Sequence, residues 1–350
     1  MYKRANSLAC FMENINDFKA FLNTPRYIVI TSHRNPDGDA IGSSLALYHY
    51  LIQHGHTVRV AFPSEFPSNF AWMAHSDRIL IHDIEPEGVE EALDKADLVF
   101  CLDFNGLDRI DRMGEYIRNL TCKMAMIDHH LYPENFVDYM LSDTTASSTC
   151  ELIYDFLKLL GAENEINQTI GECIYTGIVT DTGSFRYATS SKLFKTVAFL
   201  LDKGVDDTKL QNLIHNCLNV KNLELLGHCL NNRMEIWDEF KTGLITLTKG
   251  DYEKFDIQRG DTEGIVNYLL MLKDVHIAAF ITEQPTIVKI SLRSKGNISV
   301  QEIAKKHFRG GGHLNASGGA SYASLKATVK RFKELLPEYK EKILDFSPTN

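Results

Sequence analysis

Short apolar runs alternate with longer amphipathic stretches over the first half of the chain. The runs cover residues 27–30, 57–62, 98–102 and 123–127. Their length and β-branched composition are typical of buried strands, and residues 40–54 have the apolar spacing of a helix packed on a sheet. Strands that alternate with helices favour a mostly parallel sheet with crossover helices. The pattern therefore predicts an α/β domain whose sheet is flanked by helices.

Helical patterns follow the last of these runs. Residues 149–180 have the spacing of two helices. A capping box that begins at Ser148 opens the first helix, and helix capping is a sufficient explanation for it. The second helix is expected to end near Thr180 and so to deliver Asp181. Residues 190–232 are again helical in pattern, without a linker rich in Gly, Pro or Ser.

The last third of the chain has a different pattern. Strand-like segments at 243–247, 277–282 and 286–292 accompany helical stretches at 263–271, 300–308 and 325–336. This predicts a smaller α+β domain. The length of 350 residues also favours two domains, because single cores seldom grow beyond about 250–300 residues. We expect a first domain over residues 1–195, a helical connection over 196–234 and a second domain over 235–350.

Polar clusters rich in Asp and His follow three of the four predicted strands. They are His33 with the turn Pro36-Asp37-Gly38-Asp39, then Asp103, then Asp128-His129-His130. Each cluster alone has an ordinary explanation, since an Asp in a turn often caps a helix and a lone Asp at a strand end accepts loop hydrogen bonds. Open α/β sheets, however, place ligands at the carboxyl ends of their strands. Three such endings in one domain therefore indicate one cleft.

These clusters and Asp181 together supply a set of metal donors. The set contains four carboxylates and two imidazoles, from Asp37, Asp39, Asp103, Asp181, His33 and His129. Hard oxygen ligands mixed with imidazole suit Mn²⁺ or Mg²⁺ better than a structural zinc. Six ligands are too many for one catalytic ion that also holds water, but they suit two ions that share a carboxylate. Such centres hydrolyse phosphoesters by clamping the phosphoryl oxygens, so we expect two divalent cations, Mn²⁺ or alternatively Mg²⁺.

A glycine-rich segment in the last third is a second candidate site. Gly310, Gly311 and Gly312 precede His313, and two further glycines follow at 318 and 319. Consecutive glycines expose backbone N–H groups to an anion, and a histidine adds a donor. Upstream, Arg293 and Ser294 end a predicted strand, and a guanidinium suits phosphate. Residues 286–313 carry six basic side chains against Glu302 alone, although a solvated face also explains the adjacent lysines at 305 and 306.

Charge and cysteine content limit the partners. The net charge is -9, and residues 235–350 carry 17 basic against 15 acidic side chains, so the acidity lies in residues 1–234. Such a protein is repelled by long polyanions, so long duplex nucleic acid is not an expected partner. Seven cysteines without close clustering favour reduced thiols and a cytoplasmic location. Because no apolar run reaches the ~18 residues of a membrane span, a membrane is not an expected partner either.

The motifs in their order and spacing resemble the DHH phosphoesterase family. They are His33-x-x-Pro36-Asp37-Gly38-Asp39, Asp103, Asp128-His129-His130 and Asp181, and the segment from Gly310 to His313 with Ala316-Ser317-Gly318 resembles the DHH-associated C-terminal domain. The resemblance covers nearly the whole chain. It implies a two-domain enzyme with a binuclear, usually manganese, centre in a cleft between the domains. At this size the chain is similar to the nanoRNase group, which degrades very short RNA to mononucleotides and dephosphorylates 3'-phosphoadenosine 5'-phosphate.

The resemblance also implies roles for single residues. One ion would be held by His33, Asp37 and Asp103, and the other by Asp39, Asp103, His129 and Asp181, with Asp103 bridging. Asp103 and His130 would be the catalytic residues, and His130 would face the scissile phosphate instead of a metal. The far phosphate of the substrate would be bound by Arg293, Ser294, His313 and the backbone of Gly310, Gly311 and Gly312.

Several functions are compatible with these motifs and metal donors. The expected partners are short RNA oligonucleotides or small phosphorylated nucleotides, and the alternatives are a cyclic or linear dinucleotide, polyphosphate, or a longer single strand as in RecJ-type exonucleases. The net charge disfavours the last of these. A nucleotide-binding regulator is the non-enzymatic alternative, disfavoured because a mere binder does not need six metal ligands. Phe185 and Tyr187 could stack a base, although aromatics after a helix usually belong to the core. The oligomeric state is open, with a homodimer as one option.

Overall fold

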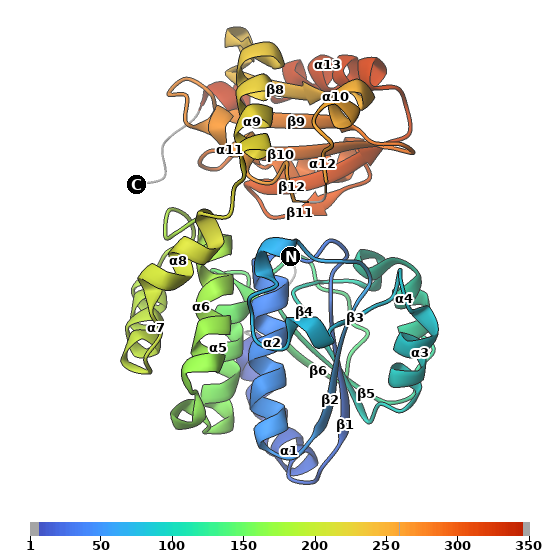
Figure 1. Cartoon of the computed structure of the whole chain (residues 1–350), viewed down its shortest axis with the longest axis vertical. Helices are drawn as coiled ribbons and strands as arrows, with labels where there is room; N and C mark the ends of the chain where they lie inside the picture. The colour runs from blue at the N-terminus through green and yellow to red at the C-terminus, as the bar shows by residue number, and fades with distance from the viewer. Residues whose placement is uncertain (1–6, 259, 346–350) are drawn as a thin grey trace. The chain divides into compact units, whose positions relative to one another are not determined.

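The structure is a computed structural model that describes residues 7–258 and 260–345. It divides into two units, Met1–Cys217 and Leu218–Asn350 (Figure 1). The division falls within residues 196–234, where the sequence predicts a helical connection. Each unit contains one six-stranded sheet.

A parallel sheet forms the centre of the first unit. Its strands are β1 (Tyr27–Ser32), β2 (Thr57–Phe62), β3 (Leu80–Ile81), β4 (Leu98–Leu102), β5 (Lys123–Asp128) and β6 (Tyr139–Ser142). They lie in the order β3-β2-β1-β4-β5-β6, and every neighbouring pair is parallel. The predicted α/β fold and its four strands are confirmed. The two outer strands, β3 and β6, were not predicted because they are too short to give a periodic signal.

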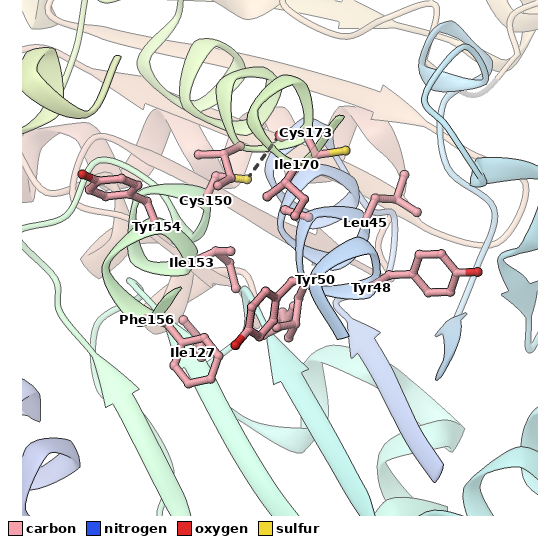
Figure 2. Packing of buried hydrophobic residues seen from close by; sticks show 14 of the residues in the cluster. Leu45, Tyr48, Tyr50, Ile127, Cys150, Ile153, Tyr154, Phe156, Ile170 and Cys173 are labelled. Atoms are coloured by element: carbon pink, nitrogen blue, oxygen red, sulfur yellow. Dashed lines mark hydrogen bonds between the residues drawn. The ribbon is translucent and has the colours of Figure 1, made fainter. Parts of the chain in front are cut away.

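Helices cover both faces of this sheet. They are α1 (Ser7–Leu22), α2 (Gly38–Gln53), α3 (Pro86–Asp94), α4 (Asp111–Ile117), α5 (Thr149–Leu160), α6 (Gln168–Thr182), α7 (Ser191–Asp202) and α8 (Asp207–His215). Alternate residues of β1 point to different cores, so that Ile28 packs with α2, α5 and α6 while Val29 packs with α3 and α4. Figure 2 shows Leu45, Ile153 and Ile170 in the first of these cores, one residue from each of its three main helices.

Glycines allow α2, α5 and α6 to approach one another closely. A Cβ added at Gly38 would lie 2.5 Å from Thr180 Oγ1. A Cβ added at Gly177 would collide with Cys150 Sγ and lie 2.6 Å from Asp39 Oδ1. The Cys150 thiol in turn lies 3.7 Å from the backbone oxygen of residue 173, the contact drawn as a dashed line in Figure 2. The starts of α2 and α5 and the last turns of α6 are therefore packed without room for further atoms.

Gly177→Ala is expected to lower the free energy of unfolding by about 1–3 kcal/mol, because overpacking forces neighbouring atoms to shift. Thermal or urea denaturation measures this change. Gly88→Ala is the matched control, since that glycine also lies in a helix and its added Cβ would meet only the flexible Glu85 side chain, at 3.4 Å. Equal stability of the Gly177 variant and the unmodified protein would contradict the close packing.

The second unit is an α+β domain, as predicted. Its strands are β7 (Met234–Trp237), β8 (Thr242–Leu247), β9 (Ile277–Glu283), β10 (Val288–Ser294), β11 (Gly311–Gly312) and β12 (Ala316–Ser321), and its helices are α9 (Val220–Asn232), α10 (Lys249–Lys254), α11 (Ile265–Leu270), α12 (Val300–His307) and α13 (Leu325–Leu344). The strand order is β11-β12-β10-β9-β8-β7, with β8 and β9 parallel and the other pairs antiparallel. The last helix continues past Pro337 because Tyr339 and Ile343 extend its buried face. Among the described residues, none of the helices has both the length and the apolar character needed to cross a membrane.

Candidate functional site

The strand order of the first unit reverses between β1 and β4. From β1 the chain moves outward through β2 to β3, and from β4 it moves outward in the other direction to β6. Ligands of open α/β sheets bind outside the carboxyl ends of the strands at such a reversal. His33 follows β1 directly, Asp103 follows β4 directly and His129 follows β5. The residues predicted from the sequence therefore lie at the position where this fold class binds its ligands.

The first donor group consists of His33, Asp37 and Asp103. A donor atom from each of the three lies within 4.8 Å of the other two. The Nε2 atom of His33 is 3.4 Å from Asp103 Oδ2 and 3.9 Å from Asp37 Oδ1. Its Nδ1 atom is 2.9 Å from the backbone oxygen of Arg34. In the neutral imidazole, Nδ1–H donates to that oxygen and Nε2 is left to bind a metal, as in most histidine ligands.

Asp37 also caps the following helix, so the ordinary explanation of the turn is correct as well. Its Oδ1 atom accepts hydrogen bonds from the backbone N–H groups of Asp39 and Ala40, both at 3.1 Å. The cap fixes this carboxylate next to His33. Capping and metal binding are therefore compatible roles for one side chain.

The second donor group consists of Asp39, His129 and Asp181, again within 4.8 Å of one another. The Nε2 atom of His129 is 3.2 Å from Asp181 Oδ2 and 3.8 Å from Asp39 Oδ2. It is also 3.5 Å from Asp103 Oδ1, whereas Asp103 Oδ2 faces His33. The two oxygens of Asp103 thus face two imidazoles in two different groups. Helix α6 ends at Thr182, two residues beyond the predicted end near Thr180, so Asp181 lies inside its last turn.

Asp103 has a backbone conformation that is uncommon for a residue other than glycine. Its φ angle is 61°, in the left-handed region, and its side chain is buried. Asp and Asn tolerate this region better than most residues, at a cost of order 1–3 kcal/mol. The backbone N–H of Asp103 donates to the oxygen of Ile127 at 3.1 Å, which fixes the turn after β4. Strain retained at a buried carboxylate is typical of functional sites.

The electrostatics of the cluster favour a bound cation. Burial and the neighbouring carboxylates of Asp103 and Asp181 raise the pKa of Asp39 well above its usual range. Burial by itself would lower the pKa of His33, but Asp103 and Asp37 outweigh it and raise this pKa to about 10. Both shifts have the same origin, an excess of negative charge in a buried volume. A divalent cation would neutralise that excess.

The start of α5 contributes donors that the sequence analysis attributed to capping alone. Ser148 is the N-cap and accepts from the N–H of residue 151 at 3.1 Å. The N–H groups of Thr149 and Cys150 donate to Asp39, at 2.6 and 2.8 Å. The Thr149 hydroxyl donates to Asp103 Oδ1 at 3.0 Å. Capping is thus not a sufficient explanation for this segment. These contacts could have been predicted from the general rule that helix N-termini bind anions, here the carboxylates of the site.

His130 belongs to a third arrangement. Its Nδ1 atom is 2.7 Å from Asp128 Oδ1 and 3.7 Å from Asp103 Oδ1, and all three side chains are buried. An Nδ1–H bond to Asp128 fixes the ring orientation and the tautomer, and it turns Nε2 away from that carboxylate. No role for Asp128 was predicted from the sequence, although its position at the end of β5 places it beside the cluster.

The glycine segment of the second unit is built differently from the expectation. The Gly310 N–H donates to Ala304 O at 3.0 Å and the His313 N–H donates to Ala316 O at 2.8 Å, so these two groups do not form a run of exposed donors. Close packing against β12 explains why glycine is required at positions 310 and 312. A Cβ at Gly310 would lie 2.7 Å from the Cα of residue 319, and Gly312 has a φ angle of 134°.

The two residues at the end of β10 differ in their surroundings. Ser294 is buried, donates its hydroxyl to Ile298 O at 2.6 Å and accepts from Asn315 Nδ2 at 2.9 Å. These bonds use the hydroxyl inside the unit, whereas the sequence predicts a substrate contact for Ser294. Arg293 is half-buried and donates from Nη1 to Leu292 O at 3.0 Å.

The two aromatic residues after α6 have different environments. Phe185 packs against Tyr175 and Phe194, with ring centroids 6.1 and 5.7 Å apart, and belongs to the core. Tyr187 is 47% exposed, and the guanidinium of Arg186 lies 5.5 Å from its ring centroid. Only the second of these rings presents a face on which a base could stack.

Comparisons with known proteins agree with this geometry. Residues 27–178 match the DHH family, N-terminal domain, and residues 243–343 match the DHHA1 domain. The probable bifunctional oligoribonuclease and PAP phosphatase NrnA of Streptococcus mutans is 32% identical over 312 residues, which cover 88% of this chain and 93% of the relative. The cyclic-di-AMP phosphodiesterase GdpP of Bacillus subtilis is 26% identical over 330 residues, which cover 90% of this chain and 48% of the relative.

A solved structure is similar over almost the whole length. The crystal structure of an exopolyphosphatase-related protein from Bacteroides fragilis has 38% sequence identity and a TM-score of 0.89, and the match covers 96% of this chain and 98% of that one. The resemblance seen in the ordered motifs is therefore confirmed, and the chain belongs to the DHH family, with a DHHA1 domain in its second unit.

Proposed function

We propose that this protein is a metal-dependent phosphoesterase that hydrolyses short oligoribonucleotides to mononucleotides and 3'-phosphoadenosine 5'-phosphate to AMP. The observation that carries the proposal is the position of Asp103, whose two oxygens face His33 and His129 in two separate donor groups. This is the arrangement that a carboxylate shared by two ions requires. The substrate class is supported by the name of the Streptococcus mutans relative, an oligoribonuclease and PAP phosphatase.

The donor set fits two divalent cations. One would be held by His33, Asp37 and Asp103, and the other by Asp39, His129 and Asp181 together with Asp103. Carboxylate oxygens and imidazoles without a thiolate suit Mn²⁺, with Mg²⁺ as the alternative. When bound, such cations supply electrostatic stabilisation to the attacking and leaving oxygens of a phosphoryl displacement.

The protein's own residues orient and stabilise the reacting phosphate. Asp128 accepts from the Nδ1–H of His130 and so holds the ring. In the imidazolium form of this ring, the opposite Nε2–H donates a hydrogen bond to a phosphoryl oxygen. The burial of His130 strengthens this interaction because little water competes for it. In the second unit, Arg293 and His313 would bind a phosphate group.

A substrate panel tests the proposal. The Mn²⁺-loaded protein is incubated with a labelled diribonucleotide, 3'-phosphoadenosine 5'-phosphate, cyclic di-AMP, polyphosphate and a long single strand, and the products are separated chromatographically. We expect turnover of the first two substrates and little of the long strand, because the acidic chain repels long polyanions.

Other outcomes of the panel select the alternatives. Turnover of cyclic di-AMP alone would indicate a cyclic dinucleotide phosphodiesterase, the activity named for the Bacillus subtilis relative. Turnover of polyphosphate alone would favour the activity suggested by the Bacteroides fragilis neighbour. Binding of nucleotides without turnover of any substrate would overturn the enzymatic proposal and favour a regulator.

A further inference from the structure

Thr149 contacts carboxylates of both donor groups. Its backbone N–H donates to Asp39 Oδ2 at 2.6 Å and its hydroxyl donates to Asp103 Oδ1 at 3.0 Å. Asp39 belongs to one group and Asp103 to the other, and the chain separates Thr149 from them by 110 and 46 residues. We propose that Thr149 is a positioning residue that fixes the mutual orientation of these two carboxylates for two cations. This inference rests on the proposed metal site.

The hydroxyl of Thr149 is not needed to start the helix. The residue before it, Ser148, is the N-cap and accepts the hydrogen bond that capping requires. The backbone of Thr149 would serve Asp39 equally well with any side chain. Its own side chain is fully buried, and the partner of its hydroxyl is a carboxylate that also faces His33 and His129. The Thr149 hydroxyl therefore orients the Asp103 carboxylate and is not required for the start of α5.

The two carboxylates are held by different means. Asp39 accepts from two successive N–H groups, those of Thr149 and Cys150, at the positive end of α5. Asp103 accepts from the side-chain hydroxyl of Thr149 itself. Both oxygens of Asp39 and one of Asp103 are thereby directed from a single helical turn. A change in this turn alters the spacing between the two donor groups.

The experiment replaces the hydroxyl by a methyl group of the same shape. We expect Thr149→Val to weaken Mn²⁺ binding by about 10–100-fold, the usual effect of losing a partner of a metal ligand. Calorimetric titration of the metal-free protein with Mn²⁺ measures the affinities and the stoichiometry. The electron paramagnetic resonance spectrum of the loaded protein reports whether two Mn²⁺ ions remain coupled. Thr149→Ser keeps the hydroxyl and is expected to restore both readouts.

Thr176→Val is the matched control. Thr176 is also fully buried in a helix of the first unit, and its hydroxyl donates to the backbone oxygen of Glu172 at 2.7 Å. This variant is expected to bind Mn²⁺ like the unmodified protein. Thr149→Ala, which fits any space that threonine fills, replaces the valine variant if the latter does not fold. Melting temperatures measured without metal separate a loss of folding from a loss of metal binding.

The outcomes distinguish this inference from the proposed function. Unchanged Mn²⁺ affinity and coupling in a folded Thr149→Val would overturn the role of Thr149, whatever the protein hydrolyses. An equal loss in Thr176→Val would overturn it as well. An unmodified protein that binds no Mn²⁺ would instead overturn the proposed metal site itself. An unmodified protein that binds two Mn²⁺ ions but hydrolyses none of the panel would contradict only the proposed function.

Discussion

Asp103→Asn is expected to lower kcat/KM for the preferred substrate by at least about 10³-fold. The change removes a negative charge from both donor groups at once, since Asp103 Oδ2 faces His33 and Oδ1 faces His129. Stabilisation of charge by metal ions contributes several kcal/mol to such reactions, and every 1.36 kcal/mol corresponds to a factor of ten in rate. Asparagine is preferred to alanine because it tolerates the left-handed backbone at this position.

Steady-state rates and Mn²⁺ titrations of the same preparation check this prediction. Asp138→Asn is the control in the same unit, because its carboxylate accepts from the Met124 N–H at the start of β5, away from the carboxyl end of that strand. The control variant is expected to lose stability but to keep its activity within a few-fold. A folded Asp103→Asn that binds two Mn²⁺ ions and turns over substrate normally would refute the bridging role.

Much of the fold and of the donor set was predictable because both depend on local pattern and on one topological rule. Apolar runs such as residues 98–102 mark buried strands, and parallel strands bring their carboxyl ends to one edge. Once the strands were placed, His33, Asp103 and His129 had to lie near one another.

The remaining features depend on contacts between distant parts of the chain. Thr149 and Asp39 are 110 residues apart, and no periodic pattern records that one donates to the other. The partner of His130 was missed for a related reason, since the motif Asp128-His129-His130 does not show which ring nitrogen of His130 faces Asp128. The sequence also did not show that the Gly310 N–H is used inside the unit, because glycines serve both anion binding and close backbone packing.

His130→Ala is expected to lower kcat by about 10²–10⁴-fold while leaving Mn²⁺ affinity close to that of the unmodified protein. The reason is that His130 lies outside the two donor groups that would hold the cations, and a positioned histidine that donates to the reacting group contributes this range. Asp128→Asn keeps the shape of the partner but removes its charge, so the ring loses its fixed tautomer. We expect this variant to lose kcat as well, with little change in KM.

The double variant decides whether the two residues act as a unit. If Asp128 acts through His130, adding Asp128→Asn to His130→Ala produces no further loss of kcat, because the group that it orients is already absent. Two independent roles would instead give losses that multiply. His54→Ala is the matched control, since His54 forms a similar pair with Glu165, 2.6 Å apart, on the surface of the same unit. Removal of that pair is expected to leave kcat unchanged, so a loss in the His130 variant reflects its place beside Asp103 and not the general cost of breaking a histidine–carboxylate pair.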